Sequence, residues 1–326
     1  MSSILDQVVT VGVESTYGTP ETSTVRSYEA KVDTFSRDVE YLQSIGFRRD
    51  LQTVRSDRDD TISLGATGSI ECDILNKGQG LLLQHVLGTT SGPTQNGSTT
   101  AYKSTFSTDD TGPTGSYTVQ VSRVDSGGTL RPYTYEGCVA TGFNISQDLG
   151  SNLSMTIDFD AENEQTSTGE ATPSYPSGAD PFHYTQSVIA FDGSATTNLT
   201  AFSLDGDLSM KTDRKFLAGS ATKAQPKRSG VPSYTGTISA EFASLTDYER
   251  FTGGTTFSIN ASWNGATIES PWAYEFVVSI PVAKLTGSTP VASLDDLTVI
   301  EMPFTVLDGG SSAAVTFNYT STDTSL

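Results

Sequence analysis

The sequence predicts an all-β protein, mainly antiparallel, with one short α-helix in each of two tandem domains. Several segments alternate apolar and polar residues over the length of a strand. Three short patterns also recur in the same order along the 326 residues, which are enough to bury a large core. We therefore expect a first domain over residues 1–164, a linker over 165–187 and a second domain over 188–326.

The three recurring patterns define the expected repeat. The pairs are "TFSRDVEY" (34–41) with "AFSLDGDL" (201–208), "TGSIECDIL" (67–75) with "TGTISAEFA" (235–243), and "RPYTYEGCV" (131–139) with "SPWAYEFVV" (270–278). Chance matches are the alternative in a chain so rich in Ser, Thr and Gly, but the preserved order favours duplication. The members of the third pair lie closer together along the chain than those of the second. The first copy is therefore expected to contain an insertion, which the polar stretch 88–115 supplies as a surface loop or a mobile hairpin.

Local patterns place the elements within each copy. In 67–75, Ile70, Cys72 and Ile74 fall on one face and Ser69, Glu71 and Asp73 on the other. In 152–160, Leu153, Met155, Ile157 and Phe159 are expected to face inward, with Asp158 and Asp160 outward. Short helices are expected over 78–88 and 244–254, the second beginning near Ser244 and ending at Gly253 and Gly254.

The charge balance is strongly acidic. Asp and Glu number 38 against 19 Lys and Arg, giving a net charge of −19. Such a chain repels nucleic acid because its long-range field has the same sign as phosphate, although the acidity can also simply aid solubility. The opening "MSSILDQVVTVGVES" lacks the basic start and apolar core of a secretory signal, and no apolar run reaches membrane length. We expect the protein to have no membrane anchor and to assemble in a cytoplasm.

No catalytic centre, metal site or cofactor is expected. His85 lies in an apolar helix segment that favours packing, and His183 has no second His or Cys nearby to complete a metal site. Cys72 and Cys138 lie in strand-like runs and are expected to be buried free thiols. The segment 158–164 resembles a calcium loop only weakly, and nothing singles out a pair of carboxylates for glycan cleavage. An enzyme is therefore disfavoured.

Two polar loops hold nearly half of the basic residues. The loop over 47–60 contains Arg48, Arg49, Arg55 and Arg58, and the matching loop over 213–230 contains Arg214, Lys215, Lys223, Lys227 and Arg228. These are either solvated charged loops or basic arms that bind an acidic surface, most readily that of another copy of the chain.

Three further segments follow one another along the chain: "VGVESTYGTPE" (11–21) followed by "YEAKVDTF", "KGQGLLLQHVLG" (77–88) and "YTYEGCVATGFNISQDLGSNLSMTIDFDAENE" (133–164). Taken in this order, they resemble major tail tube proteins of long-tailed, non-contractile bacterial and archaeal viruses. The resemblance implies β-sandwich-like domains with a flanking helix. It also implies self-assembly into stacked rings, with other tail proteins at the tube ends and a location in the virion tail. With two tube domains per chain, three chains would close a ring of pseudo-sixfold symmetry.

In such a tube, viral DNA would pass without specific binding, and the long loops would reach the next ring. The basic residues of both loops are then candidate inter-ring contacts. Candidate residues of an acidic lumen are Asp38, Glu40, Glu71, Asp73, Asp158, Asp160, Asp205, Asp207 and Glu241. The alternatives are a β-sandwich decoration protein or adhesin and, less favoured, a glycan-cleaving enzyme.

Overall fold

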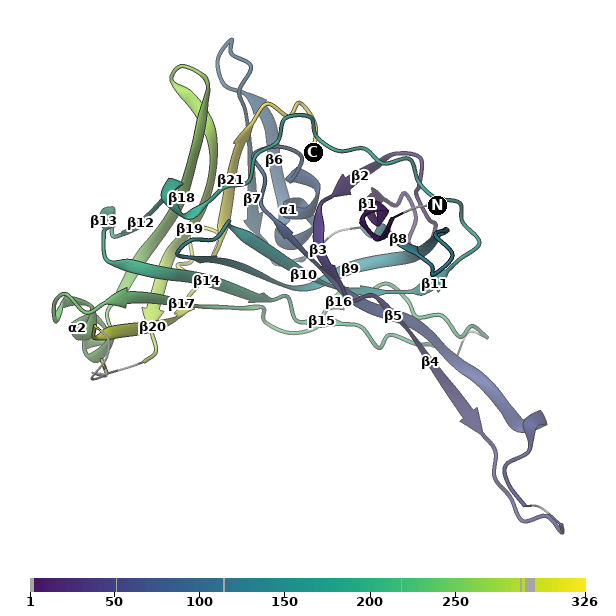
Figure 1. Ribbon diagram of the computed structural model, residues 1–326. Coiled ribbons are helices and arrows are strands. Elements are labelled where there is room, and N and C mark those ends of the chain that lie inside the picture. Colours follow the sequence, from purple (N-terminus) through teal and green to yellow (C-terminus); the bar gives the residue numbers. More distant parts are fainter. Residues whose placement is uncertain (1–2, 51, 114, 218, 288, 291–296) are drawn as a thin grey trace.

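Figure 1 shows a computed structural model of the chain, which describes residues 3–50, 52–113, 115–217, 219–287, 289–290 and 297–326. The predicted fold class is confirmed. The strand pairings of the described residues are all antiparallel, and two short α-helices accompany them.

One long sheet, here called the central sheet, joins the two halves of the chain. Its strands lie in the spatial order β4, β5, β10, β9, β14, β17 and β20, with β3 also on β5 and the end of β19 on β20. The bounds are β3 Ala30–Asp33, β4 Ser36–Gln43, β5 Asp59–Asp73, β9 Leu130–Asp148, β10 Ser154–Ala161, β14 Leu199–Asp207, β17 Ser233–Glu241, β19 Trp272–Leu285 and β20 Val299–Val306. The β9–β14 pairing carries the hydrogen bonding from one half into the other.

Each half adds an outer sheet to the central one. The first outer sheet has the order β2, β1, β8, β9 and β11. The second has the order β13, β12, β18, β19, β21, β7 and β6. Bounds are β1 Val8–Val13, β2 Val25–Tyr28, β6 Gly88–Gln95, β7 Tyr102–Thr108, β8 Tyr117–Val124, β11 Asn163–Gln165, β12 Ser187–Phe191, β13 Ser194–Thr196, β18 Thr256–Glu269 and β21 Thr316–Ser321. Strand β9 pairs in both the central and the first outer sheet, and β19 pairs in both the central and the second, so the sheets enclose a core between them.

Both predicted helices are present, but only one is buried. Helix α1 (Gly80–Leu87) lies inside the molecule against β7 and β9, with Leu82, Leu83 and Val86 fully buried. Helix α2 (Thr246–Gly253) has no buried residue and ends where Gly254 takes a left-handed conformation at φ 61°. The short elements are the 3-10 helices Ile4–Asp6, Ser56–Arg58 and Tyr184–Gln186, and the strands β15 (Met210–Lys211) and β16 (Lys227–Arg228).

The pairings of the first half recur in the second half in the same order. The hairpin β4–β5 corresponds to β14–β17, and the pairings β5–β10 and β9–β10 correspond to β17–β20 and β19–β20. Gly68 opposes Phe159 in one half, and Gly236, its counterpart in the second sequence pattern, opposes Phe304 in the other.

The third sequence landmark does not occupy equivalent positions. Phe159 opposes Ala140 on β9, and Phe304 opposes Leu285 on β19, whereas the sequence match aligns Ala140 with Ser279. Pro132 lies within β9 opposite Ser122, whereas Pro271 lies in the turn between β18 and β19. A slip by an even number of positions keeps every side chain on the same face of a strand, so the alternating pattern matched equally well out of register.

The predicted insertion over 88–115 forms the hairpin β6–β7. It is not a mobile loop, because β7 pairs with β21 of the second half from Ser107 opposite Thr316 to Tyr102 opposite Ser321. Phe106 of β7 is fully buried. The insertion therefore fastens the first half to the outer sheet of the second.

The segment expected to be a linker is held along its length. The Ser174 carbonyl accepts a hydrogen bond from the Ser27 N–H, the Ala171 N–H donates to Gln120, and the Phe182 N–H donates to the Ile74 carbonyl. This segment lies against the first half as an extended strap (Figure 1).

Candidate functional site

One face of the central sheet is almost entirely polar. On β10, Asp158 opposes Ser69 of β5 and Gly142 of β9, and on β14, Asp205 opposes Asn144 of β9 and Thr235 of β17. Following these registers across the sheet gives one set of side chains, here called the polar face. Its members include Val32, Ser36, Asp38, Glu40, Gly65, Thr67, Ser69, Glu71, Asp73, Gly142, Asn144, Ser146, Asp148, Ser154, Thr156, Asp158, Asp160, Ala201, Ser203, Asp205, Asp207, Ser233, Thr235, Thr237, Ser239, Glu241, Val299, Glu301, Pro303 and Thr305.

The opposite face of the same strands forms the core. Its residues include Ile157, Ile145, Leu204 and Ile238, each at most 1% exposed. Because side chains alternate along a strand, burying this apolar face turns every intervening residue toward the polar face.

The nine acidic residues named as candidates for an acidic lumen all lie on the polar face, but their surroundings differ. Asp38, Asp158, Asp205, Asp207 and Glu241 are exposed. Glu71 and Asp73 are partly buried, and Lys31 Nζ lies 2.5 Å from an Asp73 carboxylate oxygen. The exposed Glu40 bonds Lys215 Nζ at 3.0 Å.

Asp160 faces the same side of the sheet as Asp158, but it is buried and not exposed to solvent as the alternation predicted. Its carboxylate lies 2.5 Å from Lys223 Nζ, and the two side chains are 5% and 10% exposed. Burial raises the pKa of Asp160, and the Lys223 ammonium opposes that shift. The loop that carries Lys223 covers this end of the face, where the Leu64 N–H donates to the Ala221 carbonyl.

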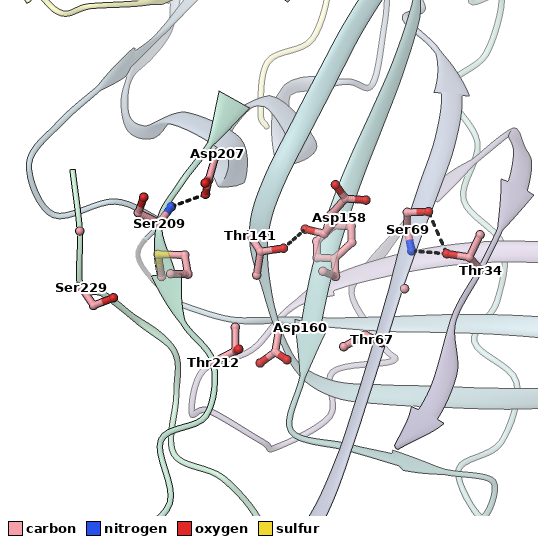
Figure 2. A pocket seen from close by; sticks show the side chains of 14 residues that line it. Thr34, Thr67, Ser69, Thr141, Asp158, Asp160, Asp207, Ser209, Thr212 and Ser229 are labelled. Atoms are coloured by element: carbon pink, nitrogen blue, oxygen red, sulfur yellow. Dashed lines mark hydrogen bonds between the residues drawn. The ribbon is translucent and has the colours of Figure 1, made fainter. Parts of the chain in front are cut away.

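A hollow of about 750 Å³ opens on the polar face beside this pair (Figure 2). Among the described residues, its lining contains Asp158, Asp160 and Asp207 amid serine, threonine and glycine residues, together with Phe159 and Met210, and neither lysine nor arginine. The Ser209 N–H donates to Asp207 Oδ1 at 2.8 Å, and the Thr141 hydroxyl donates to the Asp158 carbonyl at 3.3 Å. These contacts leave carboxylates and hydroxyls facing the opening.

The two basic loops differ in their contacts. The first lies in the arm, defined as the hairpin β4–β5 with its loop 44–58, which extends far from the body of the molecule (Figure 1). There Arg55 pairs with Asp57 of the same loop, which lowers the pKa of Asp57, while Arg49 is 3.9 Å from Asp50.

The second loop is folded back onto the molecule. Arg214 donates to the Gln225 carbonyl and Arg228 donates to the Asp109 carbonyl, in addition to the Lys215–Glu40 and Lys223–Asp160 pairs. Lys227 lies on β16. Four of the five basic side chains of this loop therefore bond within the chain. The loop is not the free arm that the sequence predicts.

Sequence reasoning missed three contributors to the polar face. Asn144 Nδ2 donates to Asp205 Oδ1 at 2.7 Å across the β9–β14 joint, Lys31 pairs with Asp73, and Glu301 adds a carboxylate on β20. The alternation in "VIEMPFTV" could have placed Glu301. The other two depend on pairings between distant strands.

His85 and the two cysteines are accounted for by packing. His85 is fully buried in α1, its ring stacks on Tyr117 at a centroid distance of 3.9 Å, and its Nε2 accepts the Ala140 N–H at 3.0 Å. This hydrogen bond requires an unprotonated Nε2, and burial lowers the pKa of His85 to about 3. Cys72 and Cys138 are buried free thiols, as predicted.

Other classes of site receive no support from the described ranges. There, no three His, Cys, Asp or Glu side chains gather in a way that could hold a metal ion. None of the helices in the described ranges has the length and apolar character needed to cross a membrane.

Comparison with known proteins identifies the family of the chain. Among curated proteins no sequence matches the chain. A family model described as phage tail tube protein matches residues 5–319, which is nearly the whole length and includes every strand of the central sheet. The chain therefore belongs to the phage tail tube protein family, whose members are structural components of the virion tail.

Proposed function

We propose that the chain is the major tail tube protein of a long-tailed, non-contractile virus and polymerises into stacked rings around a channel for DNA. The observation that carries the proposal is the polar face, which runs without a break across both halves of the chain. An all-β protein whose central sheet buries one face and offers the other as a broad acidic surface is suited to line a water-filled bore.

We also propose that residues 1–164 and 188–326 are duplicated tube domains and that three chains close one ring. The repeated order of strand pairings supports the duplication, and the β9–β14 joint supplies a pattern for contacts between neighbouring domains. With four strands per domain, six domains give a barrel of 24 strands. Strands spaced about 4.8 Å apart and tilted about 45° then give a diameter of roughly 50 Å, which leaves ample room for a DNA duplex about 20 Å wide.

The acidity of the polar face suits passage rather than binding. Each phosphate contact from a lysine or arginine would hold the moving DNA, whereas carboxylates keep it away from the wall. The exposed Asp158, Asp205 and Asp207 lie close together across β10, β9 and β14 and supply this repulsion.

Electron microscopy of the purified protein tests the proposal. The expected particles are rings and hollow tubes, with three 34.6-kDa chains in each ring. In the infected host, we expect this assembly to take place in the cytoplasm before virion release. Compact monomers at every concentration would contradict the tube. Rings of six chains would contradict the pairing of two tube domains in one chain.

A further inference from the structure

The end of the arm carries large apolar side chains that the rest of the chain does not cover. Ile45 is 77% exposed and Phe47 is fully exposed, and Tyr41 and Leu42 nearby are also exposed. The loop is fastened mainly at its base, where the Ser44 N–H donates to the Arg58 carbonyl. A cluster of exposed apolar side chains on a projecting element is typical of a binding surface.

A groove with matching character lies on the body of the molecule. It occupies about 390 Å³ between the β12–β13 hairpin and the ends of β9 and β14, and Leu149, Tyr184, Val188 and Leu199 line it. The first three of these side chains are themselves exposed. The groove is large enough to admit one or two large side chains.

The arm and the groove lie at opposite ends of the central sheet. Successive antiparallel pairings make β14 run in the same direction as β4. The groove contains Leu199, where β14 begins, whereas the arm continues from Gln43, where β4 ends. Figure 1 shows the two regions on opposite sides of the molecule. Copies stacked head to tail therefore direct the arm of one toward the groove of the next.

Charge complements the apolar match. Arg48 and Arg49 directly follow Phe47 at the end of the arm. Asp148 lines the groove, and Glu241 lies beside it, because the Glu241 N–H donates to the carbonyl of Asn198. Both carboxylates are exposed. An arm that inserts Phe47 would bring its two arginines near these acids.

We propose that the arm binds a second copy of the chain in the neighbouring ring, with Ile45 and Phe47 in the groove and Arg48 and Arg49 at its acidic rim. The contact is heterologous, so it propagates along the tube instead of closing a dimer. This inference rests on the proposed stacking of rings and names the surface that receives the arm.

A variant with Ile45→Ser and Phe47→Ser tests the apolar contact. We expect it to form rings but to need at least about a tenfold higher protein concentration to form tubes, because it loses two central apolar contacts. The matched control carries Leu5→Ser and Val231→Ser, which replace two apolar residues that are highly exposed elsewhere, and it should polymerise as the parent does.

A disulfide identifies the receiving surface directly. The pair Phe47→Cys and Leu149→Cys should give a ladder of cross-linked chains in oxidised tubes, whereas either single variant should not, since Cys72 and Cys138 are buried. Tubes of the serine variant at the parent's concentration, or parent-like tubes of the cysteine pair without a ladder, would overturn the docking and leave the tube function standing. A parent chain that never assembles would overturn both.

Discussion

At the scale of single residues, the contacts of a side chain decide how it contributes to the polar face. Asp158 and Asp160 are two residues apart on β10 and point the same way, yet Asp158 is exposed and Asp160 is buried against Lys223. Alternation along the strand predicts their shared direction. Alternation cannot predict that Asp160 is buried, because Lys223, which pairs with it, comes from a loop 63 residues further along the chain.

The Lys223–Asp160 pair should be sensitive to loss of one partner. Replacing Lys223 with Met leaves a buried carboxylate without its cation, and we expect the free energy of unfolding to fall by about 3 kcal/mol. Adding Asp160→Asn to that variant removes the uncompensated charge and should restore most of the stability. Chemical denaturation of the single and double variants measures this, and equal stabilities for the two would contradict a charge penalty.

His85 should make stability depend on pH. The unfolded chain binds a proton at this ring below pH 6.5, whereas the folded chain does so only near pH 3, so folding loses stability as the pH falls between these values. From pH 6.5 to pH 5 the loss amounts to about 1.6 kcal/mol.

Denaturation of the unassembled chain across this pH range measures the effect. A His85→Gln variant, whose amide oxygen can still accept the Ala140 N–H, should show a flatter decline even if its stability at pH 7 is lower. The control His183→Gln should decline like the parent chain. Parallel curves for His85→Gln and the parent would show that His85 does not cause the decline.

At the scale of elements, the order of strands and helices was predictable, but their partners were not. The strand 67–75 and both helices were read from alternation and end signals, which are local properties. The spacing of the repeated patterns and the polar composition of 88–115 predict an insertion there, as either a surface loop or a mobile hairpin. Its pairing with β21, near the other end of the sequence, is set by the whole fold. The second basic loop likewise matched the first in charge, and only its tertiary contacts hold it against the molecule.

The arm's arginines should not contribute equally to assembly. Arg55 is already neutralised by Asp57, whereas Arg48 and Arg49 follow the exposed Phe47. We expect Arg48→Ser with Arg49→Ser to slow tube growth about tenfold at low salt, because approach to the acidic rim loses its electrostatic attraction. The matched variant Arg55→Ser with Arg58→Ser should change growth much less. Light scattering across a salt series measures both, and equal rates for the two variants would contradict this assignment.

At the scale of the whole molecule, the central sheet has one face packed in the core and the other exposed to water. The side that faces the outer sheets holds the core, so the fold depends on it, while the polar face can vary in charge without disturbing that core. The net charge of −19 is thus partly a property of one surface. Composition predicted the repulsion of nucleic acid, but strand register was needed to show that the nine acidic residues lie on one face.

This separation makes the charge of the proposed channel testable without unfolding the protein. Asp158→Lys, Asp205→Lys and Asp207→Lys change three exposed side chains on the polar face, so tubes should still form. Linear duplex DNA should pass through parent tubes without binding to them. It should bind inside the lysine tubes with an affinity that falls steeply as salt rises, because each lysine–phosphate contact releases a counterion.

The variant with Asn at the same three positions separates added positive charge from lost negative charge, and should bind DNA weakly at most. Sedimentation of labelled DNA with tubes at several salt concentrations measures all three. Lysine tubes that hold no more DNA than parent tubes would show that the polar face does not line the channel.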